Sequence, residues 1–388
     1  MTASARSQIS AFRALAINAE ANALEASGKS ITHCEIGQPA RDAPQAVRDA
    51  ALAALTDAPQ GYTEAAGRPK LREGIARWYM DQYGVDVAPH RIMLTAGSSP
   101  ALVTAFLTAF DAGARVGWQM PGYAAYRNTL AALDIEPVGI PAREESEFRL
   151  TIGKLEAISP ALDGLILASP ANPTGTMLPA EDLSALCRWC EDEAGIRLIS
   201  DEVYHGLNYD MQPETALAHA PSAIVTSGFS KYFAMTGWRL GWAVVPDDLC
   251  DPFERLLQNL FVAPPTLAQH AALAALDCKE ELDGYADDYR ANRDMLLRML
   301  PAMGFTDIAP ADGAFYLFVE TSHLHENSEQ LAADWLHSTG LAVTPGTDFD
   351  PDQGHRFIRM SYAGSREDMA NAIEALATWL DSNASVIR

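Results

Sequence analysis

From about residue 90 the chain alternates short apolar segments with segments of helix length, and this alternation restricts the fold more than any other feature. Helix-length stretches such as SSPALVTAFLTAF and AEDLSALCRWCEDEAG separate most of the apolar segments. The pattern predicts an α/β domain with a largely parallel sheet, and a ligand is expected just beyond the carboxyl ends of its strands. The apolar segments are 91–97, 114–120, 162–169, 196–202, 223–228 and 238–245.

Both ends of the chain depart from this alternation. About 45 residues at the start do not follow it, and a long charged helical stretch after Asp277 leads into the strand-like segments FYLFVE and RFIRMSY. A chain of 388 residues is also long enough for two domains. We therefore predict a three-layer α/β/α large domain over 46–279 and a smaller α+β domain made of 1–45 together with 280–388.

The acidic composition limits the possible partners. A formal net charge of −23 disfavours nucleic acid and anionic membranes, because both are bound by a basic surface. No run of about 18 apolar residues is present, and the N-terminal stretch is typical of an amphipathic helix and not of a signal peptide. Five scattered cysteines, an odd number, are typical of a reduced protein, so a cytoplasmic location is predicted.

One cysteine pair has the spacing of a redox or metal motif. Cys187 and Cys190 form a C-x-x-C, but they lie within a predicted helix and no second pair completes a zinc site. Helix packing is the better interpretation of this pair, and no metal site is predicted.

Several polar residues directly follow predicted strands. Asp201 ends one apolar segment and Tyr204 lies three residues later, an arrangement that by itself is typical of a surface turn. Lys231 follows another segment, and Arg239 stands eight residues on. Small and apolar neighbours would lower the pKa of a buried lysine and make its amine a nucleophile.

Two further segments resemble ligand-binding turns. TAGSSPA (95–101) runs from a strand into an apolar helix, so its backbone N–H groups and the hydroxyls of Ser98 and Ser99 can bind an anion, although ordinary helix capping would use the same residues. Asn172 lies in ASPANPTG, which alone indicates only a turn.

The combination of motifs is much more specific than each part. PANPTG (170–175), DEVY (201–204) and GFSKYFAMTGWRLG (228–241) occur in this order and resemble the cofactor-binding signature of class I and II aminotransferases, the pyridoxal-phosphate (PLP) enzymes of fold type I. The similarity extends from IGQP (36–39) to FIRMSYA (357–363). The resemblance implies an enzyme that moves the amino group of an α-amino acid to a 2-oxo acid.

The resemblance assigns the cofactor ring to five residues. Lys231 would form an aldimine with PLP and move the substrate proton, giving pyridoxamine phosphate after transfer. Asp201 would pair with the ring nitrogen, which lets the ring accept electrons. Asn172 and Tyr204 would bind the ring oxygen, and Tyr123 would stack on the ring face, although core packing is an alternative for this tyrosine.

The resemblance also assigns the cofactor phosphate. Ser98, Ser99, Ser230 and Arg239 would bind it within one chain. Tyr62 matches a tyrosine that, in this family, reaches the phosphate of the other subunit. A homodimer with shared active sites is therefore implied, whereas a tyrosine in a surface turn is the alternative interpretation.

The resemblance assigns substrate recognition to two further residues and, again, to Asn172. Arg359 matches the arginine that binds the substrate α-carboxylate with two parallel hydrogen bonds, and Gly37 and Asn172 match residues beside that carboxylate.

Two cations that read acidic side chains in relatives are missing from this sequence. Gln258 stands where dicarboxylate-specific members have an arginine, and Ser99 stands where another aspartate-active branch has a lysine. A neutral donor, apolar or aromatic, is therefore predicted. Arg41, in an unusual position after GQP, is the one alternative reader of a distal carboxylate.

Two other functions are compatible with parts of the pattern. A PLP lyase, such as a carbon–sulfur β-lyase or a cyclopropane-carboxylate synthase, uses the same residues and releases a product without a 2-oxo acid acceptor. A PLP-sensing transcription regulator carries a basic winged-helix domain ahead of this fold. About 35 residues before IGQP and a net charge of −23 disfavour the regulator.

Overall fold

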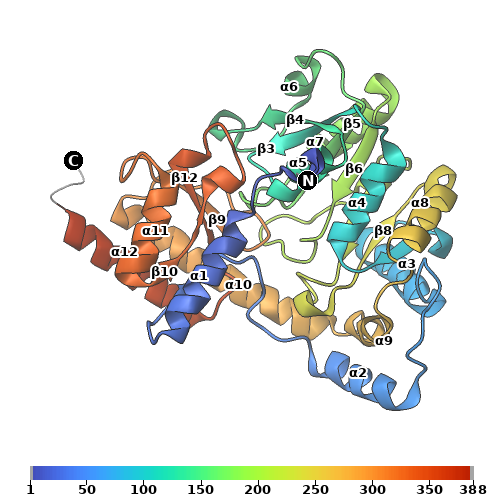
Figure 1. The fold of residues 1–388 in the computed structure, drawn as a ribbon, viewed down its shortest axis with the longest axis horizontal. Helices are drawn as coiled ribbons and strands as arrows, with labels where there is room; N and C mark the ends of the chain where they lie inside the picture. Colours follow the sequence, from blue (N-terminus) through green and yellow to red (C-terminus); the bar gives the residue numbers. More distant parts are fainter. Residues whose placement is uncertain (1–2, 385–388) are drawn as a thin grey trace.

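A seven-stranded sheet forms the centre of the larger part of the molecule (Figure 1). The computed structural model describes residues 3–384. Parallel pairing joins β3 to β4 and β5, β5 to β6, and β6 to β7, whereas β8 is antiparallel to both β2 and β7. The predicted, largely parallel sheet is therefore confirmed, with one reversed strand. In sheet order the strands are β2 (Ile92–Thr95), β8 (Gly241–Val244), β7 (Ile224–Gly228), β6 (Arg197–Asp201), β5 (Gly164–Ala168), β3 (Arg115–Met120) and β4 (Glu136–Pro141).

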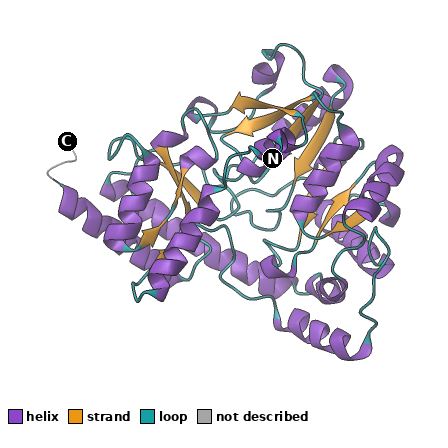
Figure 2. Ribbon diagram, viewed as in Figure 1, coloured by secondary structure: helices purple, strands orange, loops and turns teal. Residues whose placement is uncertain are grey.

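Helices cover both faces of this sheet, as the alternation of strand side chains requires. Ile166, Ile199 and Ile224 share one apolar cluster with α4, α5 and α8. Leu165 and Leu198, one residue away along two of the same strands, share the other cluster with α3, α7 and α9. The three-layer α/β/α arrangement is visible in Figure 2. The helices of this part are α2 (Gln45–Asp57), α3 (Pro69–Tyr83), α4 (Ser98–Ala109), α5 (Ala124–Ala132), α6 (Ile152–Glu156), α7 (Ala180–Arg188), a π-helical turn (Trp189–Ala194), α8 (Asp247–Leu260) and α9 (Thr266–Ala275).

The two ends of the chain form the smaller part together. The parallel pair β1–β10 joins them directly, and β11, β12 and β9 form an antiparallel sheet beside it. In Figure 1 the blue helix α1 lies against the red and orange C-terminal elements. An α+β domain built from both chain ends is thus confirmed, while its boundaries at 45/46 and 279/280 stay a prediction. Its elements are α1 (Arg13–Ala26), β1 (Thr32–His33), α10 (Lys279–Met299), β9 (Tyr316–Glu320), α11 (Ser328–Thr339), β10 (Leu341–Ala342), β11 (Thr344–Pro345), β12 (Phe357–Ser361) and α12 (Arg366–Asn383).

The C-x-x-C motif belongs to the core of the large part. Cys187 and Cys190 are both fully buried where α7 passes into the π-helical turn, and burial raises the pKa of each thiol to about 12. A protonated, buried thiol is a poor nucleophile and a poor metal ligand, which favours the packing interpretation. Within residues 3–384 no three His, Cys, Asp or Glu side chains are grouped as a metal ion would require. Across the same range, none of the helices combines the length and apolar character needed to cross a membrane.

Candidate active site

Eleven of the twelve predicted site residues line one cavity of about 370 Å³. The cavity lies where β2, β3, β5, β6 and β7 end, between the sheet and the smaller part of the molecule. The five strands run in the same direction, so residues that follow them meet at one edge. The eleven are Gly37, Ser98, Ser99, Tyr123, Asn172, Asp201, Tyr204, Ser230, Lys231, Arg239 and Arg359.

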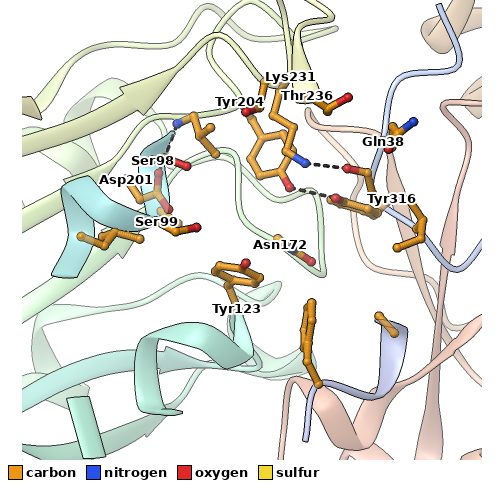
Figure 3. Close-up of a pocket in the computed structure, with 18 of the residues that line it drawn as sticks. Gln38, Ser98, Ser99, Tyr123, Asn172, Asp201, Tyr204, Lys231, Thr236 and Tyr316 are labelled. Carbon is orange, nitrogen blue, oxygen red and sulfur yellow. Dashed lines mark hydrogen bonds between the residues drawn. The ribbon is translucent and has the colours of Figure 1, made fainter. Parts of the chain in front are cut away.

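Lys231 projects into this cavity from the loop after β7 (Figure 3). Its Nζ donates a hydrogen bond of 2.5 Å to the backbone oxygen of Gly37, across the boundary between the two parts of the molecule. Burial, with the positive charges of Arg359 and Arg239, lowers the pKa of the Lys231 amine to about 8. About a tenth of this amine is therefore unprotonated at pH 7, far more than in a free lysine, and this form can act as a nucleophile or a base.

Asp201, the last residue of β6, presents a buried carboxylate to the same cavity. Tyr126 on α5 donates a 2.6 Å hydrogen bond to its Oδ2, and the Val203 amide donates to its Oδ1 at 3.3 Å. Burial raises the pKa of Asp201, while these two donors and the nearby Lys231 lower it. The site thus holds a carboxylate that a positively charged ring nitrogen would stabilise further.

Arg359 on β12 is held rigidly at the other side of the cavity. Its Nη1 donates to Oδ1 of Asn172 at 3.0 Å, and its Nη2 donates to the backbone oxygen of Glu35 at 2.6 Å. The guanidinium carbon lies 4.4 Å from the ring centre of Tyr316 and 4.7 Å from that of Phe349. Its Nε is buried and has no partner among the described residues. A guanidinium held by these hydrogen bonds and aromatic contacts is suited to a planar carboxylate.

An anion cradle lies at the start of α4. Gly97 has φ +99°, and a Cβ at this position would come within 2.4 Å of Nη2 of Arg239. A Cβ at Gly241 would come within 2.7 Å of the Ser98 amide nitrogen. Because neither glycine carries a Cβ, the backbone at the start of α4 and the Arg239 guanidinium can lie close together. Their N–H groups can therefore bind the same anion. Nη1 of Arg239 donates to the Thr236 backbone oxygen at 2.9 Å, which fixes its direction.

Two tyrosines of the sequence motifs meet in the centre of the cavity. The hydroxyls of Tyr204 and Tyr316 are 2.8 Å apart and hydrogen-bonded, as Figure 3 shows. Tyr123, at the start of α5, packs edge-on against Phe12 with ring centres 5.9 Å apart. Tyr123 also lines the cavity, so its stacking on a cofactor ring stays a prediction.

Three further residues of the sequence analysis lie outside the cavity lining, namely Tyr62 of the phosphate assignment and Arg41 and Gln258 of the substrate argument. Tyr62 is 87% exposed in the single chain. Arg41 donates to Oδ2 of Asp288 at 2.5 Å and lines a neighbouring cavity, which shares Gln38, Thr236 and Gly237 with the first. Gln258 is exposed on α8.

The sequence analysis missed three aromatic residues that line the cavity, namely Phe12, Tyr126 and Tyr316. Tyr126 and Tyr316 lie in the segments MPGYAAY (120–126) and GAFYLF (313–318), within the range over which the family resemblance extends, so these segments were a usable signal for both. Phe12 precedes α1 and has no comparable signal.

Comparison with known proteins agrees with the class of protein that this fold and cavity define. A family model described as aminotransferase class I and II matches residues 31–376. The valine–pyruvate aminotransferase of Mycobacterium tuberculosis is 44% identical, over 92% of this chain and 95% of its own. The aspartate/prephenate aminotransferase of Thermus thermophilus is 34% identical, over 94% of each chain. The crystal structure of an aminotransferase from Mycobacterium tuberculosis superposes with a TM-score of 0.96 at 41% identity, covering 98% of this chain and 100% of its own.

The fold and the cavity thus define an aminotransferase of the PLP fold type I class, in which a lysine, a carboxylate and an anion cradle surround one pocket. The chain belongs to the aminotransferase class I and II family. It is an enzyme that transfers the amino group of an amino acid to a 2-oxo acid. Enzymes of this family are generally PLP-dependent.

Proposed function

We propose that this aminotransferase holds PLP on Lys231 and prefers a neutral, apolar amino donor such as valine, with a small 2-oxo acid such as pyruvate as acceptor. The observation that carries the cofactor proposal is the donor set of the cavity. An amine with a lowered pKa, a buried carboxylate and an anion cradle open into it from one edge of the sheet.

The residues present fit the two ends and the reactive carbon of this cofactor. Arg239 and the start of α4 match a phosphate, and the glycines that would clash if they carried a Cβ keep that place open. Asp201 would keep a proton on the ring nitrogen, and Lys231 would hold the aldehyde carbon. When bound, PLP supplies an electron sink that weakens the Cα–H bond of an amino acid attached to it.

The chain's own residues account for the remaining steps. Arg359 would bind the substrate α-carboxylate, and its buried Nε, which has no partner among the described residues, is an available donor. The carboxylate so held fixes the direction of the Cα–H bond. Lys231, once free, would take that proton from Cα as a base and deliver it to the cofactor carbon that carried the aldehyde, because its pKa of about 8 is close to neutral pH. The Gly37 backbone oxygen keeps Nζ beside the place of transfer.

The donor proposal depends on the charges near the cavity. Ser99 lines it where a lysine would stand in one aspartate-active branch, and Arg41 is engaged by Asp288 outside it. Apolar and aromatic residues complete the lining around the reactive groups, among them Phe12, Ile36 and Leu102. The relative at 44% identity is named for valine and pyruvate, which supports the same class of donor and acceptor.

Titration of the visible absorbance of the PLP-loaded protein with single amino acids, without an acceptor, tests both parts. Valine and leucine are expected to remove the visible band at lower concentrations than aspartate, and pyruvate to restore it. Lys231→Ala should show no lysine-linked band, and Arg41→Ala should leave the donor ranking unchanged. Aspartate acting at the lowest concentration would contradict the donor proposal. A wild-type protein without the band would contradict the cofactor proposal, and ammonia release without an acceptor would indicate a lyase.

We further propose a cytoplasmic homodimer in which Tyr62 reaches the partner's site. Tyr62 lies on a surface that also exposes Leu52 and Leu55 of α2 and Val262 after α8. A hydrogen bond of 2.7 Å from Thr266 to the Gly61 backbone oxygen ties these segments together. Exposed apolar side chains gathered in this way favour burial against another surface. The five free thiols support the reducing compartment, and the net charge of −23 disfavours nucleic acid as a partner.

A further inference from the structure

One side chain of the cavity lining, Tyr316, has no role in the proposed function. It is the first residue of β9, is 1% exposed, and lies between the groups assigned to the cofactor and the group assigned to the substrate carboxylate. Its hydroxyl contacts one of these groups and its ring face contacts the other. A side chain that touches both can fix their positions relative to each other.

The hydroxyl of Tyr316 is directed at Tyr204. The two hydroxyl oxygens are 2.8 Å apart, and the rings meet edge to face with centres 5.8 Å apart. Burial raises the pKa of both phenols, so both stay protonated at neutral pH. Either hydroxyl can donate in this pair. A cofactor oxygen that accepts from Tyr204 sets the direction, because Tyr204 must then accept from Tyr316.

The backbone beside Lys231 is shaped to admit this hydroxyl. A Cβ at Gly37 would lie 1.8 Å from the Tyr316 hydroxyl oxygen, so only glycine leaves room for it. The carbonyl oxygen of Gly37 is the acceptor of the Lys231 amine. The position of Tyr316 is therefore fixed against the segment that also holds the reactive lysine.

The ring face of Tyr316 supports Arg359. In the antiparallel pair β9–β12, Tyr316 is opposite Ser361 and Phe318 is opposite Arg359, so Tyr316 and Arg359 are diagonal neighbours on one face. The guanidinium carbon lies 4.4 Å from the ring centre, within the range of a cation–π contact. The ring of Tyr316 therefore restricts the guanidinium, and the ring of Phe349, whose centre is 4.7 Å from the guanidinium carbon, is a second aromatic contact.

We propose that Tyr316 is a positioning residue of the transamination site, which aims the Tyr204 hydroxyl at the cofactor's ring oxygen and holds the Arg359 plane for the substrate carboxylate. The proposal rests on the proposed function, since it requires PLP in this cavity. It separates two contributions of one side chain, the hydroxyl toward the cofactor and the ring toward the substrate.

The hydroxyl contribution is tested by the pH dependence of the visible absorbance of the PLP-loaded protein. A donor on the ring oxygen lowers the proton affinity of the neighbouring lysine-linked nitrogen. Tyr316→Phe is therefore expected to raise the pH midpoint of the spectral change by roughly half to one unit, the effect of one hydrogen bond. Tyr204→Phe should raise it at least as much, and the double variant should match Tyr204→Phe alone, because Tyr316 acts through Tyr204.

The ring contribution is tested by steady-state kinetics. Tyr316→Leu is expected to raise KM for the amino donor about fivefold or more, whereas Tyr316→Phe keeps the ring and should leave KM near the wild-type value. Tyr289→Phe is the matched control, since it removes a buried hydroxyl that has no partner among the described residues. This control should change neither the midpoint nor KM.

The outcomes distinguish this inference from the proposed function. A wild-type protein that binds no PLP would overturn the proposed function itself. A normal wild-type spectrum with an unchanged midpoint in Tyr316→Phe, or shifts that add fully in the double variant, would overturn the positioning role alone. If Tyr316→Leu does not fold, the pH titration of Tyr316→Phe still tests the positioning role of Tyr316.

Discussion

At the scale of single residues, Lys231 is prepared for chemistry by its neighbours before any ligand is bound. Arg359 and Arg239 approach the cavity from opposite parts of the molecule, and both disfavour a second positive charge there. Burial adds to this effect, and together they lower the pKa of the amine to about 8. Each arginine thus has two functions, since it would bind an anion and also keeps Lys231 partly unprotonated.

The titration of Lys231 can be measured in the cofactor-free protein. Trace labelling with acetic anhydride across a pH series, read by mass spectrometry, should give a midpoint of about 8 for Lys231. Arg359→Gln removes the positive charge with the larger effect on this pKa and should move the midpoint upward, because the protonated amine then experiences less repulsion. Surface lysines of the same sample provide the internal reference. A midpoint near about 10.4, the value of a free lysine, would contradict this account.

The hydrogen bond from Tyr126 to Asp201 permits a second test. Tyr126→Phe removes a donor that lowers the pKa of this buried carboxylate, so that pKa should rise further and the negative charge become less available. We expect PLP to bind about tenfold more weakly, the effect of losing one hydrogen bond to a charged group. The loss should begin at a higher pH than in the wild type as the pH is lowered.

Equilibrium dialysis of the cofactor at several pH values measures this effect. Tyr289→Phe again serves as the control, because its hydroxyl lies outside the cavity lining. Equal affinity of the wild type and Tyr126→Phe at all pH values would show that Asp201 does not depend on this donor.

The sequence predicted the residues that carry the proposed chemistry better than the residues that hold them in place. Lys231, Asp201 and Arg239 follow strands and lie in motifs, and the parallel sheet brings them to one edge as predicted. The bond between Tyr126 and Asp201 joins residues 75 positions apart, and no local pattern encodes which side chains meet across such a distance. The same holds for Arg41, whose partner Asp288 is 247 positions away.

At the scale of elements, α1 depends on a cap supplied from the far end of the chain. Phe12 precedes the helix and its side chain has no acceptor, so the carboxylate of Asp348 accepts from the Arg13 and Ala14 amides, each at 3.0 Å. Because Phe12 and Ala14 line the cavity, this cap also positions one wall of the site. An acidic group at a helix start is stabilised by the helix dipole as well.

Asp348→Asn should loosen the first turn of α1. The amide retains one acceptor oxygen and loses the negative charge, so about 1 kcal/mol of local stability is expected to be lost. Hydrogen exchange of the amides at 13–17 should become faster, while α12 stays protected. Asp368→Asn is the matched control, since it weakens the capping box that Ser365 and Asp368 form at α12. Unchanged exchange at 13–17 in Asp348→Asn would show that other contacts hold α1.

Elements with a strong apolar signal were predicted well, and weak or reversed elements were not. Six apolar segments correspond to β2, β3, β5, β6, β7 and β8. The edge strand β4 was missed because its residues are mostly half-exposed or exposed and include Pro137 and Pro141. The reversal of β8 could not be predicted, since it depends on the tight path of residues 229–240 around Lys231 and Arg239.

At the scale of the whole molecule, one predicted residue remains unexplained by the single chain. Tyr62 is 87% exposed and does not reach the cavity of its own chain. It stands beside other exposed apolar side chains on α2 and after α8, on a protein whose surface is otherwise strongly acidic. A symmetric dimer would bury this surface against its own copy and bring Tyr62 toward the partner's cradle.

Hybrid dimers can test whether each site uses residues from two chains. Tyr62→Ala is expected to weaken PLP binding and lower the activity, and Lys231→Ala is expected to abolish it. When the two variants are unfolded together and refolded, a hybrid dimer contains one site with an intact Lys231 and the partner's intact Tyr62. Random pairing in equal amounts makes about half of the dimers hybrid, each with one of two sites intact, so about a quarter of the wild-type activity should return. If Tyr62 acted within its own chain, neither site of the hybrid would be intact and the activity would stay at the level of the Tyr62→Ala sites alone.

A mixture of Tyr62→Ala with Arg239→Ala should behave like the mixture of Tyr62→Ala with Lys231→Ala, because Arg239 and Lys231 line the cavity of the same chain. Sedimentation of the wild type at the assay concentration completes the test, since a monomer there would exclude sharing between subunits.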